Sequence, residues 1–185
     1  MSTTIDTTTT TRTAIPHVIG GDRVEADGRT GAVFNPATGV QTGDVALASA
    51  DLVHAAARTA HDAQRAWRET GLGKRQQIMF RVREIISTRA EELARIITSE
   101  HGKTVPDALG EVARGLENVE FCTSLMHHLK GEYSEQVASG VDVHQVRQPI
   151  GVVACITPFN FPAMVPLWMV TTAIAAGNAV ILKPS

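Results

Sequence analysis

The sequence predicts an α/β fold in which a parallel sheet is flanked by helices and a β-hairpin protrudes. Two observations predict it: apolar runs at 151–156 and 179–182 enclose one helical segment, and amphipathic helical stretches fill the chain between 49 and 126. Two strands joined by a crossover helix form a βαβ unit, whose strands run parallel. Because the run at 151–156 is apolar without alternation, we expect this strand to be covered on both faces.

Residues 1–15 are expected to form a disordered leader. Threonine dominates this segment and apolar residues are nearly absent, so burial cannot offset the entropy of ordering it. From 17 to 47, short apolar stretches alternate with the turn signals Gly20-Gly21, Asp27-Gly28 and Asn35-Pro36-Ala37-Thr38-Gly39. This alternation predicts short hairpin strands.

Three amphipathic helices are predicted next. Apolar side chains recur at helical spacing from Ser49 to Gly71, from about Lys74 to His101, and from Pro106 to Met126. Ser49 is an N-cap and Pro106 a favoured first-turn residue. The second stretch is long enough to break near Arg89, and Gly102 suits its C-terminal cap.

Residues 132–148 predict an exposed β-hairpin. Val141 and Val143 are flanked by polar residues, and Ser139-Gly140 supplies the turn. An exposed hairpin of this kind offers an edge for pairing with another chain.

Composition narrows the class of protein. The 185 residues include 17 Lys+Arg and 19 Asp+Glu, a net charge of −2, and 43% are hydrophobic. The chain therefore lacks the excess of Lys and Arg that is needed to neutralise nucleic-acid phosphates, and we do not expect it to bind nucleic acid. Without a secretion signal we expect a cytoplasmic protein. Cys122 and Cys155 lie in apolar surroundings and are expected to be structural. The adjacent His127 and His128 lack the i, i+4 spacing of a metal-binding pair.

The C-terminal part of the chain allows a second interpretation. Residues 161–182 carry no charge and are about as long as the ~20 residues that span a bilayer. Pro162, Pro166 and Gly177-Asn178 instead favour a helix followed by a strand in a buried α/β core. Since residues 179–185 read as a buried strand with nothing after it, we expect the chain to stop in mid-domain.

The loop at 157–162 is the strongest candidate site. It follows the first core strand, at the sheet edge where open α/β folds bind ligands. Pro158 and Pro162 stiffen the backbone, so the amide of Asn160 could serve as a preorganised donor for an oxyanion. The alternative is that this amide only hydrogen-bonds to the turn backbone. Lys183, at the carboxyl end of the next strand, points toward the same crevice, or else is a solvated lysine. Neither G-x-G-x-x-G nor G-x-x-x-x-G-K-[ST] is present, so a dinucleotide would be held otherwise.

Several motifs in register resemble the aldehyde dehydrogenase superfamily. They are 157–162 (TPFNFP), 177–185 (GNAVILKPS), 34–39 (FNPATG), 100–103 (EHGK) and 110–112 (GEV). The resemblance covers the chain from about His17 onward. Phe159, where most members carry tryptophan, together with 158–169 (PFNFPAMVPLWM) and 114–121 (RGLENVEF), is similar to the methylmalonate-semialdehyde dehydrogenases, a CoA-acylating group.

The resemblance implies an incomplete Rossmann-like parallel sheet. Residues 16–131 and 149–185 would form the N-terminal part of an NAD-binding domain, and 132–148 the oligomerisation hairpin of a homo-oligomer, a tetramer in the full-length family. The catalytic domain would be absent, and with it the nucleophilic cysteine. The chain alone would then be inactive.

The resemblance also implies a reaction and roles for five residues. Methylmalonate or malonate semialdehyde, CoA and NAD would give acyl-CoA, carbon dioxide and NADH. Asn160 would donate to the oxyanion, Thr157, Phe159 and Lys183 would line the NAD site, and Arg114 would face the substrate carboxylate. The alternatives are a hydrolytic NAD(P)-dependent aldehyde dehydrogenase and a non-catalytic binding or oligomerisation module.

Overall fold

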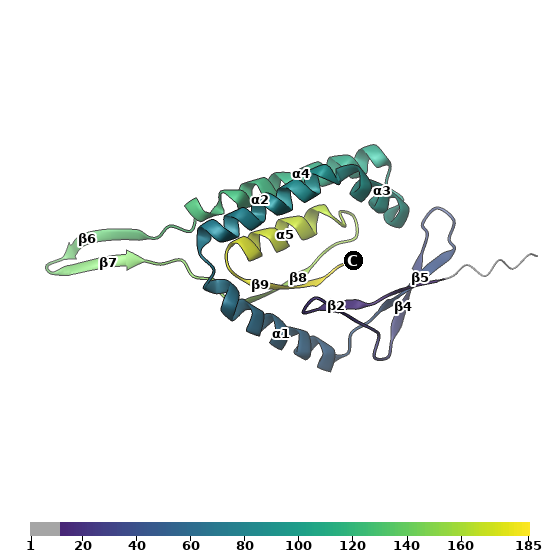
Figure 1. The fold of residues 1–185 in the computed structure, drawn as a ribbon, viewed down its shortest axis with the longest axis horizontal. Coiled ribbons are helices and arrows are strands. Elements are labelled where there is room, and N and C mark those ends of the chain that lie inside the picture. The colour runs from purple at the N-terminus through teal and green to yellow at the C-terminus, as the bar shows by residue number, and fades with distance from the viewer. Residues whose placement is uncertain (1–11) are drawn as a thin grey trace, which may run out of the picture. The chain divides into compact units, whose positions relative to one another are not determined.

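The computed structural model describes residues 12–185, drawn in colour in Figure 1. They form two compact units, the first ending at Ala55 and the second spanning Ala56–Ser185. The first unit is built from short strands, and the second from helices, a hairpin and a parallel strand pair. This mixture confirms the predicted α/β class.

The first unit contains the predicted short strands. They are β1 (Thr13–Ile15), β2 (His17–Ile19), β3 (Asp22–Val24), β4 (Thr30–Phe34) and β5 (Gln41–Ala46). β2 and β3 form one antiparallel hairpin, and β4 pairs antiparallel with β5. In the β4–β5 turn, Oδ1 of Asn35 accepts a hydrogen bond from the Ala37 N–H at 2.9 Å, and Gly39 has φ 70°. These contacts are the turn chemistry that the asparagine and glycine predicted.

The predicted disorder of the leader was wrong at its end. Thr13–Ile15 form β1, which pairs parallel with β5. The strand is exposed, so ladder hydrogen bonds to β5 rather than burial hold it in place. The remainder of the predicted leader, 1–11, lies outside the described residues.

The predicted helices are present, and the last of them ends earlier than predicted. They are α1 (Ala50–Arg68), α2 (Leu72–Thr88), α3 (Ala90–His101) and α4 (Val105–Thr123). The break falls at Arg89 as predicted, and Gly102 caps α3 with φ 82°. α4 ends at Thr123 rather than Met126, and a 3-10 turn, Leu125–His127, follows. The hydroxyls of Thr123 and Ser124 donate to the carbonyls of Glu120 and Phe121, which competes with continuing the helix.

Helix α4 is the centre of the second unit and packs against α2, α3 and α5 (Met164–Ala175). One buried cluster contains Met79, Cys122, Leu125 and Ala175, and a second contains Ala94, Ile97, Ala108 and Val112. The amphipathic stripes of the predicted helices therefore form the core.

Gly115 sets the distance between α4 and α5. A Cβ at this position would lie 2.7 Å from Cδ1 of Leu167 and 3.3 Å from the Cα of Met164. We expect Gly115→Val to lower the free energy of unfolding by about 1–3 kcal/mol, because the Leu167 side chain must move and the α5 backbone at Met164 must shift slightly. Gly110→Val on the same helix is the matched control, since nothing lies within 4 Å of a Cβ there. Equal urea midpoints for the two variants would contradict close packing at Gly115.

The βαβ unit has the predicted parallel sheet. β8 (Val152–Ile156) leads through α5 to β9 (Ala179–Lys183), with Val152 opposite Ala179 and Ile156 opposite Lys183. The side-chain Oδ1 of Asn178 accepts from the Gly151 N–H at 3.0 Å and fixes the start of the pair.

The expectation that β8 is covered on both faces was wrong. Cys155 is 1% exposed, whereas Ile156 is 71% exposed and Val152 and Val153 are only partly buried, so the strand is not covered along its whole length. The reason is the layering: α5 packs against β8 and β9, while the opposite face of this two-stranded sheet keeps exposed apolar side chains.

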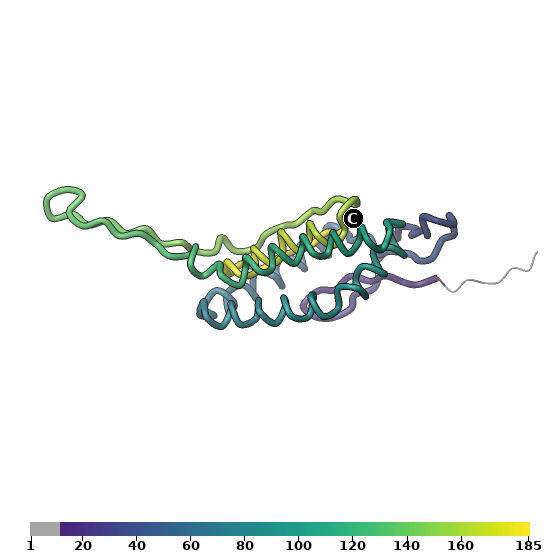
Figure 2. Tube along the Cα trace, turned by 90° about the horizontal axis from the view of Figure 1, so that it is seen from above, coloured from purple at the N-terminus to yellow at the C-terminus, as the bar shows by residue number. Residues whose placement is uncertain are grey.

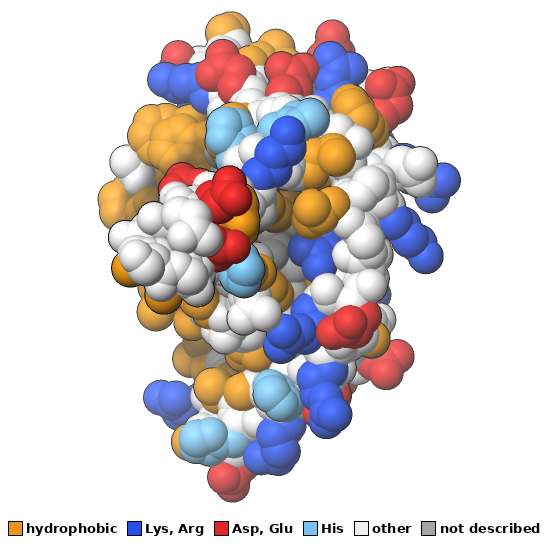
Figure 3. All heavy atoms as spheres, turned by 90° about the vertical axis from the view of Figure 1, so that its left-hand side faces the viewer, with side chains coloured by type: hydrophobic (Ala, Val, Ile, Leu, Met, Phe, Trp, Pro, Cys, Tyr) orange, Lys and Arg blue, Asp and Glu red, His pale blue; other side chains and the backbone are white. Residues whose placement is uncertain are grey.

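The predicted hairpin projects away from the helices of the second unit (Figures 1 and 2). It consists of β6 (Glu132–Ala138) and β7 (Val141–Gln145), joined at Gly140, which has φ 75°. Every residue of both strands is exposed. Figure 3, which faces the hairpin end, shows hydrophobic side chains at the surface beside charged ones.

The charge-free stretch 161–182 divides into α5 and β9, as its prolines and glycine predicted. Across residues 12–185, the length and apolarity that a membrane crossing requires are not combined in any helix.

Candidate functional site

The carboxyl ends of β8 and β9 meet at one edge of the sheet. The N–H of Thr157, the first residue after β8, donates to the carbonyl of Lys183 at 3.3 Å. The structure thus brings together two of the residues that the sequence singled out. Both lie where parallel sheets of this kind bind ligands.

The loop after β8 presents an exposed ring beside a buried hydroxyl. Phe159 is 72% exposed, whereas Thr157 is 5% exposed, and its buried Oγ1 has no hydrogen-bond partner among residues 12–185. Buried hydroxyls are normally paired, so an orphaned one beside an exposed apolar surface is a feature of a ligand site.

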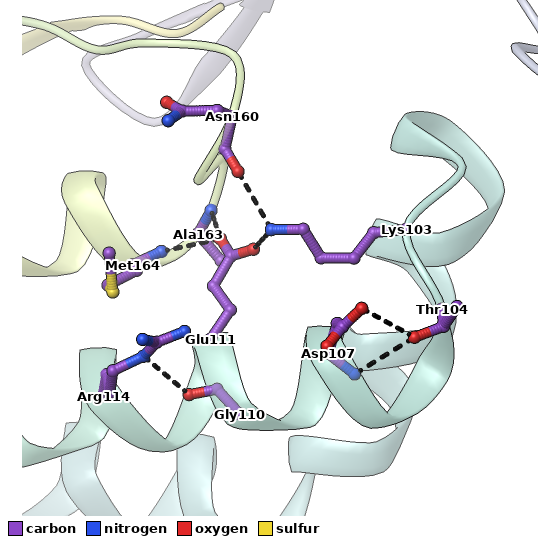
Figure 4. Close-up of polar contacts among 9 residues, drawn as sticks. All are labelled: Lys103, Thr104, Asp107, Gly110, Glu111, Arg114, Asn160, Ala163 and Met164. Carbon is purple, nitrogen blue, oxygen red and sulfur yellow. Dashed lines mark hydrogen bonds and ion pairs between the residues drawn. The ribbon is translucent and has the colours of Figure 1, made fainter.

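The main chain and the side chain of Asn160 lie in different environments. Its carbonyl accepts a hydrogen bond from Nζ of Lys103 at 2.9 Å. Figure 4 shows its amide pointing away from Lys103 and Glu111. Among the described residues that amide makes no hydrogen bond. The alternative prediction, that it bonds the turn backbone, was therefore wrong.

Sequence reasoning missed Glu111 as a site residue. Its side chain is fully buried, and Oε1 accepts from the N–H groups of Ala163 at 2.8 Å and Met164 at 3.1 Å. Oε2 pairs with Nζ of Lys103 at 2.5 Å. Helical spacing could have identified this residue. The buried face of α4 carries Ala108, Val112 and Gly115, and Glu111 lies on the same face.

Glu111 caps helix α5 from outside the helix. Ala163, at the N-cap, makes no side-chain capping bond, so the first N–H groups of α5 depend on the Glu111 carboxylate. In folds with a G-x-G-x-x-G turn, this helix terminus receives a pyrophosphate. Here a carboxylate of the protein takes that position.

The environment of Glu111 predicts a dependence of stability on pH. Burial raises the pKa of this carboxyl, but hydrogen bonds from Lys103, Ala163 and Met164 and the charge of Lys103 outweigh burial, so its pKa lies below the ordinary 4.5. A carboxyl whose pKa is lower in the folded than in the unfolded state stabilises the fold at pH values above its unfolded-state pKa. This stabilisation is lost as the pH falls through its folded-state pKa.

We therefore expect the acid limb of stability below pH 4.5 to be shallower in Glu111→Gln than in the wild type. Urea unfolding at a series of pH values measures the two slopes. Glu135→Gln on the exposed hairpin is the control and should leave the wild-type slope. Parallel acid limbs in the wild type and Glu111→Gln would contradict the assignment.

Arg114 lies against the ring that follows Asn160. Its Cζ is 5.6 Å from the ring centroid of Phe161, and its Nε donates to the Gly110 carbonyl at 3.3 Å. The guanidinium forms no ion pair with a carboxylate in the part of the chain that the structure describes. A cation free of an acidic partner beside the Asn160 loop can receive an anionic group.

The two cysteines are buried as predicted. Cys122 is 2% exposed and its Sγ contacts the hydroxyls of Thr171 and Thr172. Cys155 is 1% exposed, and burial raises the pKa of its thiol, which disfavours the reactive thiolate. Residues 12–185 contain no cluster of three or more His, Cys, Asp or Glu side chains that could hold a metal ion.

Two open cavities lie apart from the loop after β8. One, of about 570 Å³, is lined by Arg89, Glu92 and neighbours at the α2–α3 junction. The other, of about 510 Å³, is largely apolar and lies between α1, α5 and β9, with Trp67 and Ile174 in its wall. None of the five predicted site residues lines either cavity.

Known sequences resemble this chain over most of its length. A malonate-semialdehyde dehydrogenase of Pseudomonas aeruginosa is 48% identical over 169 residues, which is 91% of this chain and 34% of that protein. A second relative, malonate-semialdehyde dehydrogenase 2 of Oceanobacillus iheyensis, is 42% identical over a match that spans 96% of this chain and 37% of that protein. The chain thus spans about a third of the length of these relatives.

Solved structures give the same result. A methylmalonate-semialdehyde dehydrogenase from Oceanimonas doudoroffii superposes with a TM-score of 0.90 at 48% identity, over 94% of this chain and 36% of that one. A structure from Sinorhizobium meliloti complexed with NAD, described under the same enzyme name, has a TM-score of 0.90 at 45% identity over 95% and 36% of the two chains. The model of the aldehyde dehydrogenase family matches residues 24–185, and the chain therefore belongs to that family.

Proposed function

We propose that this chain is the N-terminal part of the NAD-binding domain of a CoA-acylating malonate- or methylmalonate-semialdehyde dehydrogenase. The complete enzyme converts semialdehyde, CoA and NAD into acyl-CoA, carbon dioxide and NADH. The relatives named for these substrates, at 42–48% identity, support this choice within the family.

The position of Arg114 is the observation that carries the substrate assignment. Its guanidinium lies on the Phe161 ring, next to the residue proposed to bind the reacting oxygen. A substrate with an aldehyde at one end and a carboxylate at the other fits a site with an amide donor and a free guanidinium. The guanidinium binds the carboxylate by paired hydrogen bonds.

Asn160 acts on the reacting carbonyl. A thiolate supplied by the catalytic part of the enzyme attacks the aldehyde, and the Asn160 amide donates a hydrogen bond to the resulting oxyanion. Since this amide has no partner among the described residues, it needs no rearrangement before it binds the substrate oxygen. Loss of a hydride, for which bound NAD would be the acceptor, would turn this intermediate into a thioester. The substrate carboxylate would leave as carbon dioxide, and CoA would take the acyl group and release the thiolate.

Three residues at the sheet edge fit a dinucleotide. The ends of β8 and β9 offer it a hydroxyl without a partner on Thr157, an exposed ring on Phe159 and a cation on the exposed Lys183. NAD, when bound, supplies the hydride acceptor. Because Glu111 blocks the terminus of α5, these residues rather than that helix terminus hold the cofactor.

The hairpin serves oligomerisation. Tyr133, Val137, Val141 and Val143 are about half exposed or more, although strands of this composition are normally covered on one face. We propose that a second copy of the chain covers these side chains and that the homo-oligomer is a tetramer. Sedimentation of a Val141→Asp, Val143→Asp double variant should give a smaller assembly than the wild type.

The test of the reaction uses the polypeptide as its source cell makes it. With malonate semialdehyde, NAD and CoA we expect acetyl-CoA, carbon dioxide and NADH in equal amounts. A free acid formed without CoA would favour the hydrolytic alternative. Binding of NAD with no turnover of any aldehyde would favour a non-catalytic module.

Arg114→Met provides the residue-specific test. We expect the KM for malonate semialdehyde to rise by about 10²-fold, in line with the loss of a charge-assisted bidentate contact, while the KM for an uncharged aldehyde stays unchanged. Arg95→Met is the control, because Arg95 forms only an exposed ion pair with Glu91. An equal change for both aldehydes would contradict recognition of the carboxylate.

A further inference from the structure

The segment between Asn160 and α5 is tied down at both ends by one ion pair. At its start, Lys103 donates to the Asn160 carbonyl at 2.9 Å. At its end, Glu111 accepts from the N–H groups of Ala163 and Met164. Lys103 and Glu111 are themselves joined at 2.5 Å, so the four contacts form one continuous network (Figure 4).

This network is shielded from solvent. The side chain of Glu111 is fully buried and that of Lys103 is 13% exposed. The ammonium also lies 4.5 Å from the ring centroid of Phe161, so it contacts the segment at a second point. Hydrogen bonds to ionised groups in such surroundings are stronger than those at the surface, and the geometry they impose is correspondingly firm.

The side chain of Asn160 has no comparable anchor. Its amide is exposed and makes no hydrogen bond within the described residues, so the direction in which it points follows from the main chain that carries it. The only polar side chain that holds the main chain of Asn160 in the described structure is Lys103, and Glu111 in turn holds Lys103.

We propose that Lys103 and Glu111 are positioning residues that orient the Asn160 amide toward the substrate oxygen. This inference rests on the proposed function, since it assigns the pair to the oxyanion step. The pair touches no substrate and acts through the Asn160 main chain. Its loss displaces the amide and lowers the rate of the chemical step, while the sheet edge proposed for NAD stays in place.

A double-mutant cycle in the enzyme as its source cell makes it tests the proposal. We expect Lys103→Met to lower kcat by about 10²-fold, the cost of a misplacement of about 1 Å, with little change in the KM for NAD. In an Asn160→Ala background the same substitution should lower kcat no further, because the group it positions is gone. Lys103→Arg should restore most of the rate, since a cation again bridges the segment.

The control is Arg83→Met, which breaks the exposed Arg83–Glu120 pair between α2 and α4. It should leave kcat unchanged in both backgrounds. If Lys103→Met lowers kcat by the same factor with and without Asn160, the pair is merely structural and the proposal is overturned. If Lys103→Met does not fold, Glu111→Gln replaces it, because its amide oxygen can still accept from Ala163 and Met164.

Hydrogen exchange separates failure of this inference from failure of the proposed function. On the same protein we expect the amides of Ala163 and Met164 to exchange faster in Lys103→Met than in Arg83→Met. Unchanged exchange overturns the positioning role even if the enzyme is active. Faster exchange together with no loss of kcat in Asn160→Ala alone contradicts the oxyanion role of Asn160, and overturns the positioning of that amide with it.

Discussion

Replacing Glu111 with alanine is expected to lower the free energy of unfolding by about 3–5 kcal/mol, the usual cost of removing one partner from a buried ion pair. The ammonium of Lys103 would stay buried without its counter-ion, and the N–H groups of Ala163 and Met164 would lose their acceptor. Urea unfolding followed by circular dichroism measures the change.

Two further variants separate charge from packing. Glu120 lies on the same helix as Glu111 and forms an exposed ion pair with Arg83 of α2. Glu120→Ala should cost less than about 1 kcal/mol. The double substitution Glu111→Leu, Lys103→Met removes both charges and should recover much of the loss, because replacing a whole buried pair by apolar groups is often nearly neutral. A Glu111→Ala variant as stable as Glu120→Ala would contradict the network described here.

Asn160→Ala is expected to lower kcat of the complete enzyme by about 10²–10³-fold, the loss that follows removal of one oxyanion-hole donor. The amide is exposed and makes no hydrogen bond within the described chain, so its removal should leave stability almost unchanged. Comparison of kcat, the dissociation constant of NAD and the melting temperature distinguishes this effect from misfolding.

Asn178→Ala is the contrasting variant for Asn160. Its side chain bonds the Gly151 N–H and the Ala173 carbonyl at the start of the β8–β9 pair, so we expect a loss of stability rather than a selective loss of kcat. A rate for Asn160→Ala within threefold of the wild type, about 0.7 kcal/mol in barrier height, would contradict an oxyanion role.

Local signals predicted most of the elements. Gly102 at a helix end and Ser139-Gly140 in a hairpin act through backbone freedom that depends on a few neighbours, so the sequence identifies them directly. The break at Arg89 and the parallel pairing of β8 and β9 followed from helical spacing and from apolar runs. At Thr13–Ile15 the prediction failed because the hydrogen-bond partners come from a strand far along the chain.

For this protein the sequence by itself determined the α/β class, the order of its elements, the family and the loop that carries Asn160, because periodicity, turn residues and motifs are written in neighbouring positions. The tertiary structure alone decided that Glu111, buried on α4, caps α5 and holds Lys103 against the Asn160 carbonyl. It also decided that Arg114 lies on Phe161. Apart from the Lys103–Glu111 pair, these contacts join residues about fifty positions apart. Their strength comes from burial, which no local pattern of side chains specifies.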